Sequence, residues 1–230
     1  CISALALPAS AATYTWTRGG SNEFWSNPSN WTPSFNNVQP LDLVFNDGNG
    51  NGINDLAAGT VFSSIRFTST AETHVFSNTN GADVAANSMN VGSGGVISSA
   101  SSFDQWIQFR LNVVNPLQVD VTGSGTLSLS SLSGTSAVTK TDGGVLVLDD
   151  FWEAKGFDQY TGNLAIQAGS VVLSQAIQGT GAKLTSATVT IGSGGMLTGG
   201  MGYVQTIVSS GTLAPGYFDG SAFGDAITTN

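Results

Sequence analysis

The sequence predicts an all-β fold in which short strands stack on one another in successive coils, and three observations lead to it. A Gly-rich turn followed at once by small or β-branched apolar residues recurs at residues 94–97, 123–129, 143–148, 168–173, 194–197 and 210–213. The last glycines of successive turns are 16 residues (195 to 211) to 30 residues (95 to 125) apart, which is typical of stacked coils with loops of differing length. Only 9% of the residues are charged, and so few Glu, Lys and Arg residues disfavour helices.

Further segments of alternating apolar residues are predicted to be strands: 61–67, 106–114, 117–121, 187–191 and 203–208. Stacked parallel strands lie about 4.8 Å apart, so their inward Val, Leu and Ile side chains form apolar ladders. We expect one shared interior to hold Leu127, Leu129, Leu146, Leu148, Val171, Leu173 and Leu197. A β-sandwich built from hairpins is the alternative fold.

Residues 1–12 have the pattern of the end of a secretory signal peptide. An apolar run leads to Pro8 and then to small residues at 9–11, which suit a signal peptidase. We therefore predict that residues 1–12 are a signal remnant and that the protein is secreted or at the cell surface. Two other interpretations stay open: Cys1 is the lipidated first residue of a lipoprotein, or the segment is an apolar strand that docks on the fold.

The segment that follows, 13–58, opens with three Trp residues, Trp16, Trp25 and Trp31. The first coil of a stack has no neighbour above it, and large aromatic side chains cover such an apolar end efficiently. We therefore predict a Trp-rich cap here. The competing interpretation is a carbohydrate platform, because the faces of Trp rings stack on sugar rings.

Several of these phrases together resemble the autotransporter-associated β-strand repeat family of secreted bacterial proteins. Residues 14–16 match Y-x-W, and residues 25–31 keep the spacing W-x-x-x-x-N-W. Residues 139–148 resemble the repeat's K-x-G-x-G-x-L-x-L phrase, with Asp142 where glycine is usual. Residues 160–173 resemble its Y-T-G and A-G-x-L-x-L continuation, and residues 210–216 its S-G-T-L-x-P-G ending.

The resemblance covers about residues 13–217 and implies a single-stranded right-handed parallel β-helix, or solenoid. Residues 13–58 would form its N-terminal cap and first strands, and residues 59–230 its repeats, truncated at the C-terminal end. It also implies a structural or adhesive passenger, a stalk that presents loops away from the cell. The alternatives from other classes are a polysaccharide-binding module and a polysaccharide lyase or hydrolase.

The residues themselves give little support for an enzyme. His74 is the only histidine and stands beside Val75 and Phe76, which favours a strand residue over a general base or metal ligand. The motifs G-x-S-x-G and H-E-x-x-H are absent from the sequence. We therefore predict no catalytic residues.

A charged and aromatic segment, 149–160, lies between two repeat phrases and is predicted to be a projecting loop. Aromatic rings beside carboxylates could bind sugar. The candidate glycan-binding residues are Trp25, Trp31, Trp152 and Tyr160, with an extracellular polysaccharide or another cell-surface component as the partner. The alternative is a solvated insertion whose rings fold back on the flank of the coil.

A second candidate site is a calcium loop, whose ligands would be Asp47, Asn49, Asn51 and Asp55. Oxygen ligands at alternate positions before a glycine match the first half of a Ca²⁺ loop. The second half does not match, because Ala58 takes the place of the bidentate acid. A solvated Asn-Gly turn is the competing interpretation, and no other cofactor is predicted.

The charge of the chain limits its partners. A net charge of −9 with six scattered Lys and Arg residues argues against nucleic acid and anionic membrane surfaces. No apolar stretch is long enough for a transmembrane helix. The exposed ends of a stack recruit partners, so we expect self-association through them, in particular through the C-terminal end.

Overall fold

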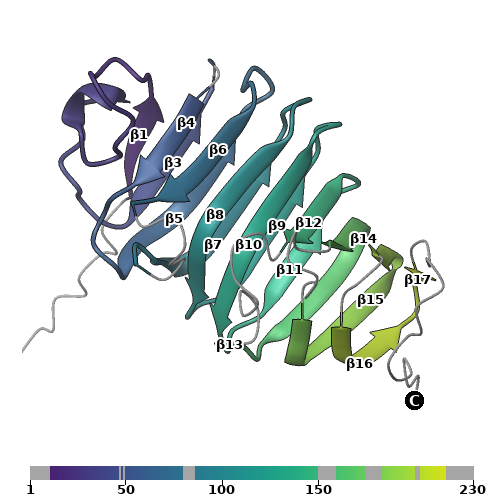
Figure 1. The fold of residues 1–230 in the computed structure, drawn as a ribbon. Coiled ribbons are helices and arrows are strands. Elements are labelled where there is room, and N and C mark those ends of the chain that lie inside the picture. The colour runs from purple at the N-terminus through teal and green to yellow at the C-terminus, as the bar shows by residue number, and fades with distance from the viewer. Residues whose placement is uncertain are drawn as a thin grey trace, which may run out of the picture.

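The computed structural model describes residues 11–46, 48, 50–79, 86–149, 159–174, 183–199 and 203–215. Within them the regular structure is β, apart from one 3-10 turn, η1 (Pro28–Asn30), and the strands follow one another along a single axis (Figure 1). No described helix is long and apolar enough to span a membrane. The strands are β1 (Ala12–Trp16), β2 (Trp31–Thr32), β3 (Leu41–Phe45), β4 (Gly50–Asn54), β5 (Thr60–Phe67), β6 (His74–Asn78), β7 (Met89–Ser99), β8 (Gln105–Val113), β9 (Leu117–Val121), β10 (Thr126–Gly134), β11 (Val138–Thr141), β12 (Val145–Asp149), β13 (Gln159–Tyr160), β14 (Asn163–Ser174), β15 (Lys183–Gly199), β16 (Tyr203–Ser209) and β17 (Thr212–Pro215).

Seven of these strands form a closed parallel barrel. Following the hydrogen-bonded pairs, β7 joins β8, β8 joins β10, β10 joins β12, β12 joins β14, β14 joins β11, β11 joins β9, and β9 returns to β7. The remaining described strands lie outside this ring: β1 to β6 toward the N-terminal end, β15 to β17 toward the C-terminal end (Figure 1), and β13, which pairs with β10. The prediction of an open right-handed β-helix is therefore wrong.

The ring closes because two long strands each pair with two different neighbours. The first residues of β7 pair with β8 and its last five pair with β9. In the same way, β14 pairs with β11 through Leu164 to Ile166 and with β12 through Ser170 to Ser174. Gly169 lies at the bend of β14 with φ 69°, and a Cβ there would come within 2.4 Å of the Asp142 carbonyl oxygen. Only glycine fits this bend.

The parallel alignment of the Gly-plus-strand phrases is confirmed. One column of paired residues runs Leu127, Leu146, Val171, Leu197 and Leu213 across five strands, and Leu129, Leu148 and Leu173 form a second column beside it. The seven residues predicted to share an interior are all buried in one apolar cluster. The predicted strands are also found, within β5, β8, β9, β15 and β16. The sandwich alternative does not apply, since the one antiparallel pair among the described strands is β1 with β2.

The N-terminal end of the barrel axis is closed by residues 17–35. The backbone of this segment bonds to the outermost strands: Trp25 N donates to the Ile53 carbonyl (3.0 Å), and Ile53 N donates to the Glu23 carbonyl (2.8 Å). Asn30, fully buried, holds the segment together by donating to the carbonyls of Asn22 and Phe24, both at 2.9 Å. We call this segment the aromatic cap, because its own side chains Trp25, Trp31 and Phe35 are buried.

Two glycines of β4 leave room for two indole rings, that of Trp16 in β1 and that of Trp25 in the aromatic cap. Gly50 and Gly52 face inward, and a Cβ on them would lie 3.3 Å from Trp16 Nε1 and 2.6 Å from Trp25 Nε1, respectively. The strand pairs in parallel with β6 over its whole length. The solvated Asn-Gly turn predicted here is therefore wrong from residue 50 onward, because Gly50–Asn54 forms a strand under the indole rings.

Ala12, the last residue of the predicted signal remnant, begins β1 and pairs with Leu41. Residues 1–10, for which the signal, lipid and docking interpretations were open, lie outside the described residues. Residues 216–230 of the predicted repeat region lie outside them as well.

Candidate functional site

The two described tryptophans proposed as glycan platforms belong to the core. Trp25 is fully buried and Trp31 is 3% exposed. The Trp25 ring contacts Trp31, Phe76 and Phe109 edge-on at centroid distances of 6.0, 5.1 and 5.5 Å. Trp31 Nε1 donates to the Trp25 carbonyl at 2.7 Å. Neither ring has a face open to a sugar, so these two residues act as packing groups of the aromatic cap.

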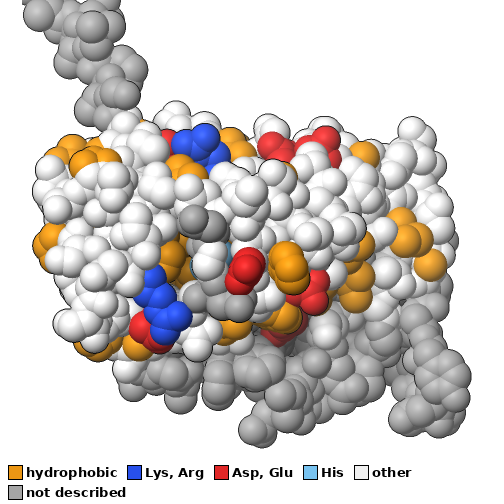
Figure 2. Space-filling view, turned by 90° about the horizontal axis from the view of Figure 1, so that it is seen from above, with side chains coloured by type: hydrophobic (Ala, Val, Ile, Leu, Met, Phe, Trp, Pro, Cys, Tyr) orange, Lys and Arg blue, Asp and Glu red, His pale blue; other side chains and the backbone are white. Residues whose placement is uncertain are grey.

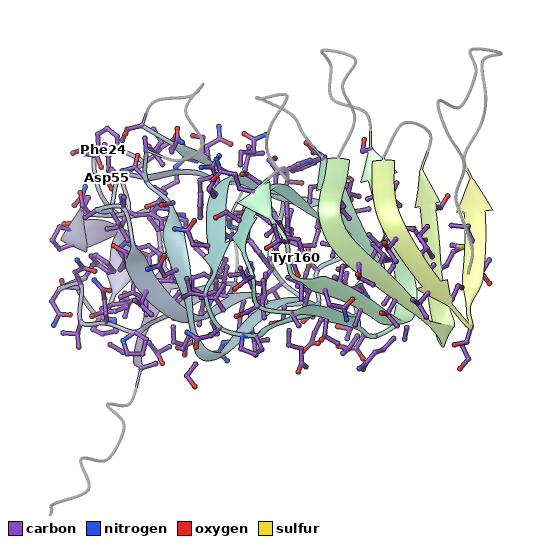
Figure 3. The ribbon with its side chains drawn as sticks, turned by 90° about the horizontal axis from the view of Figure 1, so that it is seen from below. Phe24, Asp55 and Tyr160 are labelled. Atoms are coloured by element: carbon purple, nitrogen blue, oxygen red, sulfur yellow. The ribbon has the colours of Figure 1, made fainter. Side chains whose placement is uncertain are left out.

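Tyr160 is also buried, on β13, which pairs with β10, and it lies far along the axis from Phe24 and Asp55 (Figure 3). Its hydroxyl accepts from Val138 N at 3.0 Å and lies 2.8 Å from the Asn163 carbonyl and 3.1 Å from the Ser136 carbonyl. Burial raises the pKa of the phenol far above its usual range. The Tyr160 hydroxyl therefore bonds to three backbone groups, at Ser136, Val138 and Asn163, and the ring offers no face to a glycan. The fourth proposed residue, Trp152, lies outside the described residues.

The predicted calcium ligands are not brought together in the described part of the chain. Asp47 and Asn49 lie outside it, and Asn51 is an exposed residue of β4. Asp55 accepts hydrogen bonds from the backbone N (2.8 Å) and the hydroxyl of Ser26. This carboxylate therefore fastens the aromatic cap to the residue after β4. Among the described residues, no group of three or more His, Cys, Asp or Glu side chains is placed to hold a metal ion.

His74 lies in β6, as predicted for a strand residue, and is fully buried. Its Nδ1 is 2.8 Å from the Glu72 carbonyl, and its ring lies between 5.5 and 5.9 Å from the rings of Phe45, Phe67 and Phe76. The Gln105 side chain accepts from His74 N at 3.1 Å and donates to the Glu72 carbonyl at 2.8 Å. The imidazole is therefore part of a packed corner rather than of a cleft.

Lys140 is an ionisable group that sequence reasoning missed. It lies on β11 with its side chain fully buried, and its Nζ donates to the carbonyl oxygens of Thr141 and, at 2.8 Å, of Asp142. Asp142 has φ 60°, the left-handed conformation that explains why glycine is usual at this place in the repeat phrase. The ammonium therefore holds the turn that joins β11 to β12. Burial lowers the pKa of Lys140, although the charges of Asp142 and Asp120 oppose this.

This lowered pKa gives the protein an alkaline stability profile that can be measured. Between the folded-state pKa and the unfolded value of 10.5, the unfolded chain binds more protons, so the free energy of unfolding rises with pH. The slope is at most about 1.4 kcal/mol per pH unit for one proton. We expect urea unfolding to show this rise just below pH 10.5, and Lys140→Met to abolish it. The same slope in both proteins would show that the ammonium is not desolvated.

The described surface offers one candidate binding face, on the outer side of β8. Side chains alternate along β8, so Trp106 and Arg110 point outward while Ile107 and Phe109 are buried inside. Both outward side chains are half-buried. Arg110 donates from Nε to the Ser131 hydroxyl and from Nη1 to the Gln159 side chain, both at 3.3 Å, and forms no ion pair with a described residue.

A ladder of amides and hydroxyls continues this face. Asn112 Nδ2 donates to Asn90 Oδ1 at 2.9 Å and to the Ser88 hydroxyl at 3.2 Å, while Ser133 donates to Asn112 Oδ1 at 2.5 Å. An indole, a guanidinium and amides along one outer face have the chemistry to bind a sugar chain. Nothing in the spacing of Trp106 singled it out, because its role depends on the inward and outward alternation of β8.

Comparisons with protein families, with characterised proteins and with solved structures give no match for this chain.

Proposed function

We propose that this chain is a structural or adhesive protein, secreted or displayed at the cell surface, that works as a rigid scaffold presenting its loops and carries out no catalysis. The observation that carries the proposal is the single apolar core, which runs from Tyr14 in β1 to Ile207 in β16 without a break. A core continuous along the whole axis makes a stiff body, since each strand packs on its neighbours on both sides.

The ionisable groups of the described residues support this proposal, because they serve the scaffold. Asp42 accepts hydrogen bonds from Thr13 and Ser64 and pairs with Arg66, whose Nη2 lies 2.7 Å from the carboxylate. Burial would raise the pKa of Asp42, but these hydrogen bonds and the Arg66 charge lower it overall. Figure 2 shows the charged side chains in small, separated groups on a largely uncharged surface. Such groups fasten neighbouring strands to one another.

The scaffold proposal is tested by incubating the protein with a panel of neutral and acidic polysaccharides. We expect no release of reducing or unsaturated ends, and one cooperative unfolding transition whose midpoint the polysaccharides leave unchanged. Beads coated with the protein should nonetheless adhere to cell surfaces if the role is adhesive. Release of sugar products by the protein would show an enzyme and overturn the proposal.

A second candidate function is polysaccharide binding through the outer face of β8. It is favoured by Trp106 and Arg110, which lie four residues apart on one strand and hence about 13 Å apart, a span that accommodates more than one sugar ring. In affinity electrophoresis with an acidic polysaccharide, we expect Trp106→Ala and Arg110→Ala each to weaken retardation about tenfold. Phe103→Ala is the matched control, because Phe103 is 51% exposed but precedes the strand. Equal effects at Phe103 and Trp106 would reject this site.

A further inference from the structure

The two ends of the described strand stack differ in how their backbone groups are satisfied. At the N-terminal end, the aromatic cap pairs with β4 through Ile53 and with the end of β1 through β2, where Trp31 and Thr32 lie opposite Trp16 and Thr15. At the opposite end of Figure 1, β16 and β17 pair with β15 on one side, and no other described strand pairs with them. Within the described residues, the second side of β16 is therefore an open sheet edge.

The β16 part of this edge carries neither charged residues nor proline, although its pairing with β15 has one register shift and the neighbouring β17 ends at Pro215. Natural edges carry charged side chains, prolines or bulges that discourage pairing with another chain. From Leu184 to Phe218 the sequence contains no charged residue. The strand β16 contains no proline and is rich in β-branched residues. Its outward side chain Val208 is 56% exposed, while Ile207 is 6% exposed and belongs to the core. The edge is thus competent to accept a further strand.

We propose that this edge binds the same edge of a second copy of the chain, with the two β16 strands antiparallel across a two-fold axis. The distribution of charge along the chain favours a second copy as the binding partner at this edge. The chain carries a net charge of −9, so two copies repel each other wherever charged surfaces meet, and the uncharged segment 184–218 is the end at which they approach with the least repulsion. An edge strand is also complementary to itself when it is turned antiparallel.

The capped N-terminal end limits the assembly to two copies. A head-to-tail arrangement would need an open edge at both ends and would give a filament. The aromatic cap bonds with its own backbone to Ile53 on the outer side of β4, and β2 pairs with the end of β1, so the β16 edge has no uninterrupted strand edge to pair with there. The interaction through β16 is therefore isologous and closed.

Analytical ultracentrifugation of the 230-residue chain over a range of concentrations tests this proposal. We expect a monomer–dimer equilibrium and no larger species. Val208→Lys, which brings two like charges together across the axis, should raise the dissociation constant about a hundredfold. The matched control is Val114→Lys, because Val114 is 55% exposed but lies after β8, away from the edge. It should leave the dissociation constant unchanged.

Hydrogen exchange on the wild-type protein gives a readout that does not depend on any variant. Amides of β16 should exchange more slowly at concentrations where the dimer forms, while those of the aromatic cap should not change with concentration. A monomer at every concentration, a filament, or a dimer that is weakened by Val114→Lys and not by Val208→Lys would each overturn the proposal. Protection that appears at the cap instead of β16 would overturn it as well.

Discussion

Leu146→Asp is expected to unfold the protein at neutral pH. Leu146 is fully buried and lies in the middle of the apolar column, between Leu127 and Val171. An unpaired carboxylate at that position has no described donor within the column, and the surrounding strands cannot move apart without breaking their hydrogen bonds. The expected loss is about 5 kcal/mol or more, which is comparable to the whole stability of an ordinary domain. Circular dichroism and urea unfolding measure it.

The control for this substitution is the next residue on the same strand. Val147 points outward from β12 and is half-buried, so Val147→Asp keeps the carboxylate in contact with water and should cost about 1 kcal/mol. If the two variants were equally stable, the inward and outward assignment of β12 would be wrong.

Trp25→Ala is the second substitution with a large expected effect. The ring is fully buried and contacts aromatic rings from β2, β3, β6 and β8. Its removal leaves a cavity at the junction of the aromatic cap and the core, and the expected loss is about 3–5 kcal/mol. Thermal unfolding should show a lower midpoint. A change below about 1 kcal/mol would show that the cap does not support the strands beneath it.

A double-mutant cycle separates the packing of Trp25 from a general weakening of the cap. In the wild-type protein, Gly52→Ala places a Cβ 2.6 Å from Trp25 Nε1 and 3.0 Å from Phe76 Cδ1, so it should destabilise by about 1–3 kcal/mol through overpacking. In the Trp25→Ala background the same methyl group enters the cavity and should be neutral or stabilising. Additive effects would contradict the direct contact between the glycine and the ring.

Much of the local structure could be predicted from the sequence, because it depends on neighbouring residues. The alternation of Leu146 and Leu148 with Val145 and Val147 places one set of side chains inside, whatever the strands pair with. The glycines before each such strand mark the turns. The positions of the strands and the shared interior of the Gly-plus-strand phrases could therefore be predicted from the sequence.

The closure of the strands into a barrel could not be predicted in this way. It depends on β7 and β14 each joining two neighbours, one on either side of a glycine with positive φ, Gly94 and Gly169. The same alternation and the same turns suit an open stack equally well. The pairing partner of each half-strand is a long-range property that no local pattern contains.

The candidate binding sites were predicted wrongly because the motifs do not reveal whether a side chain is buried. Tryptophan and tyrosine are typical of sugar platforms and also of cores, and Trp25, Trp31 and Tyr160 proved to be core residues. The sequence Asn49 to Gly52 suggests a turn, since nothing local reveals that two indole rings require glycine at residues 50 and 52. The burial of Lys140 was not predicted, because a lysine side chain is so rarely fully buried.

The position of the aromatic cap in the chain has a consequence for folding during synthesis. The cap and β4, which it covers, are made before β5 to β17, and the cap's contacts join residues that are close in sequence, such as Thr17 with Asn30. Loops of this length close quickly and at a small entropic cost. The cap therefore begins to form once β4 is made, and it is completed when Phe76 of β6 and Phe109 of β8 pack on Trp25. We expect folding to proceed in the direction of translation, with the N-terminal strands protected from exchange before β15 and β16.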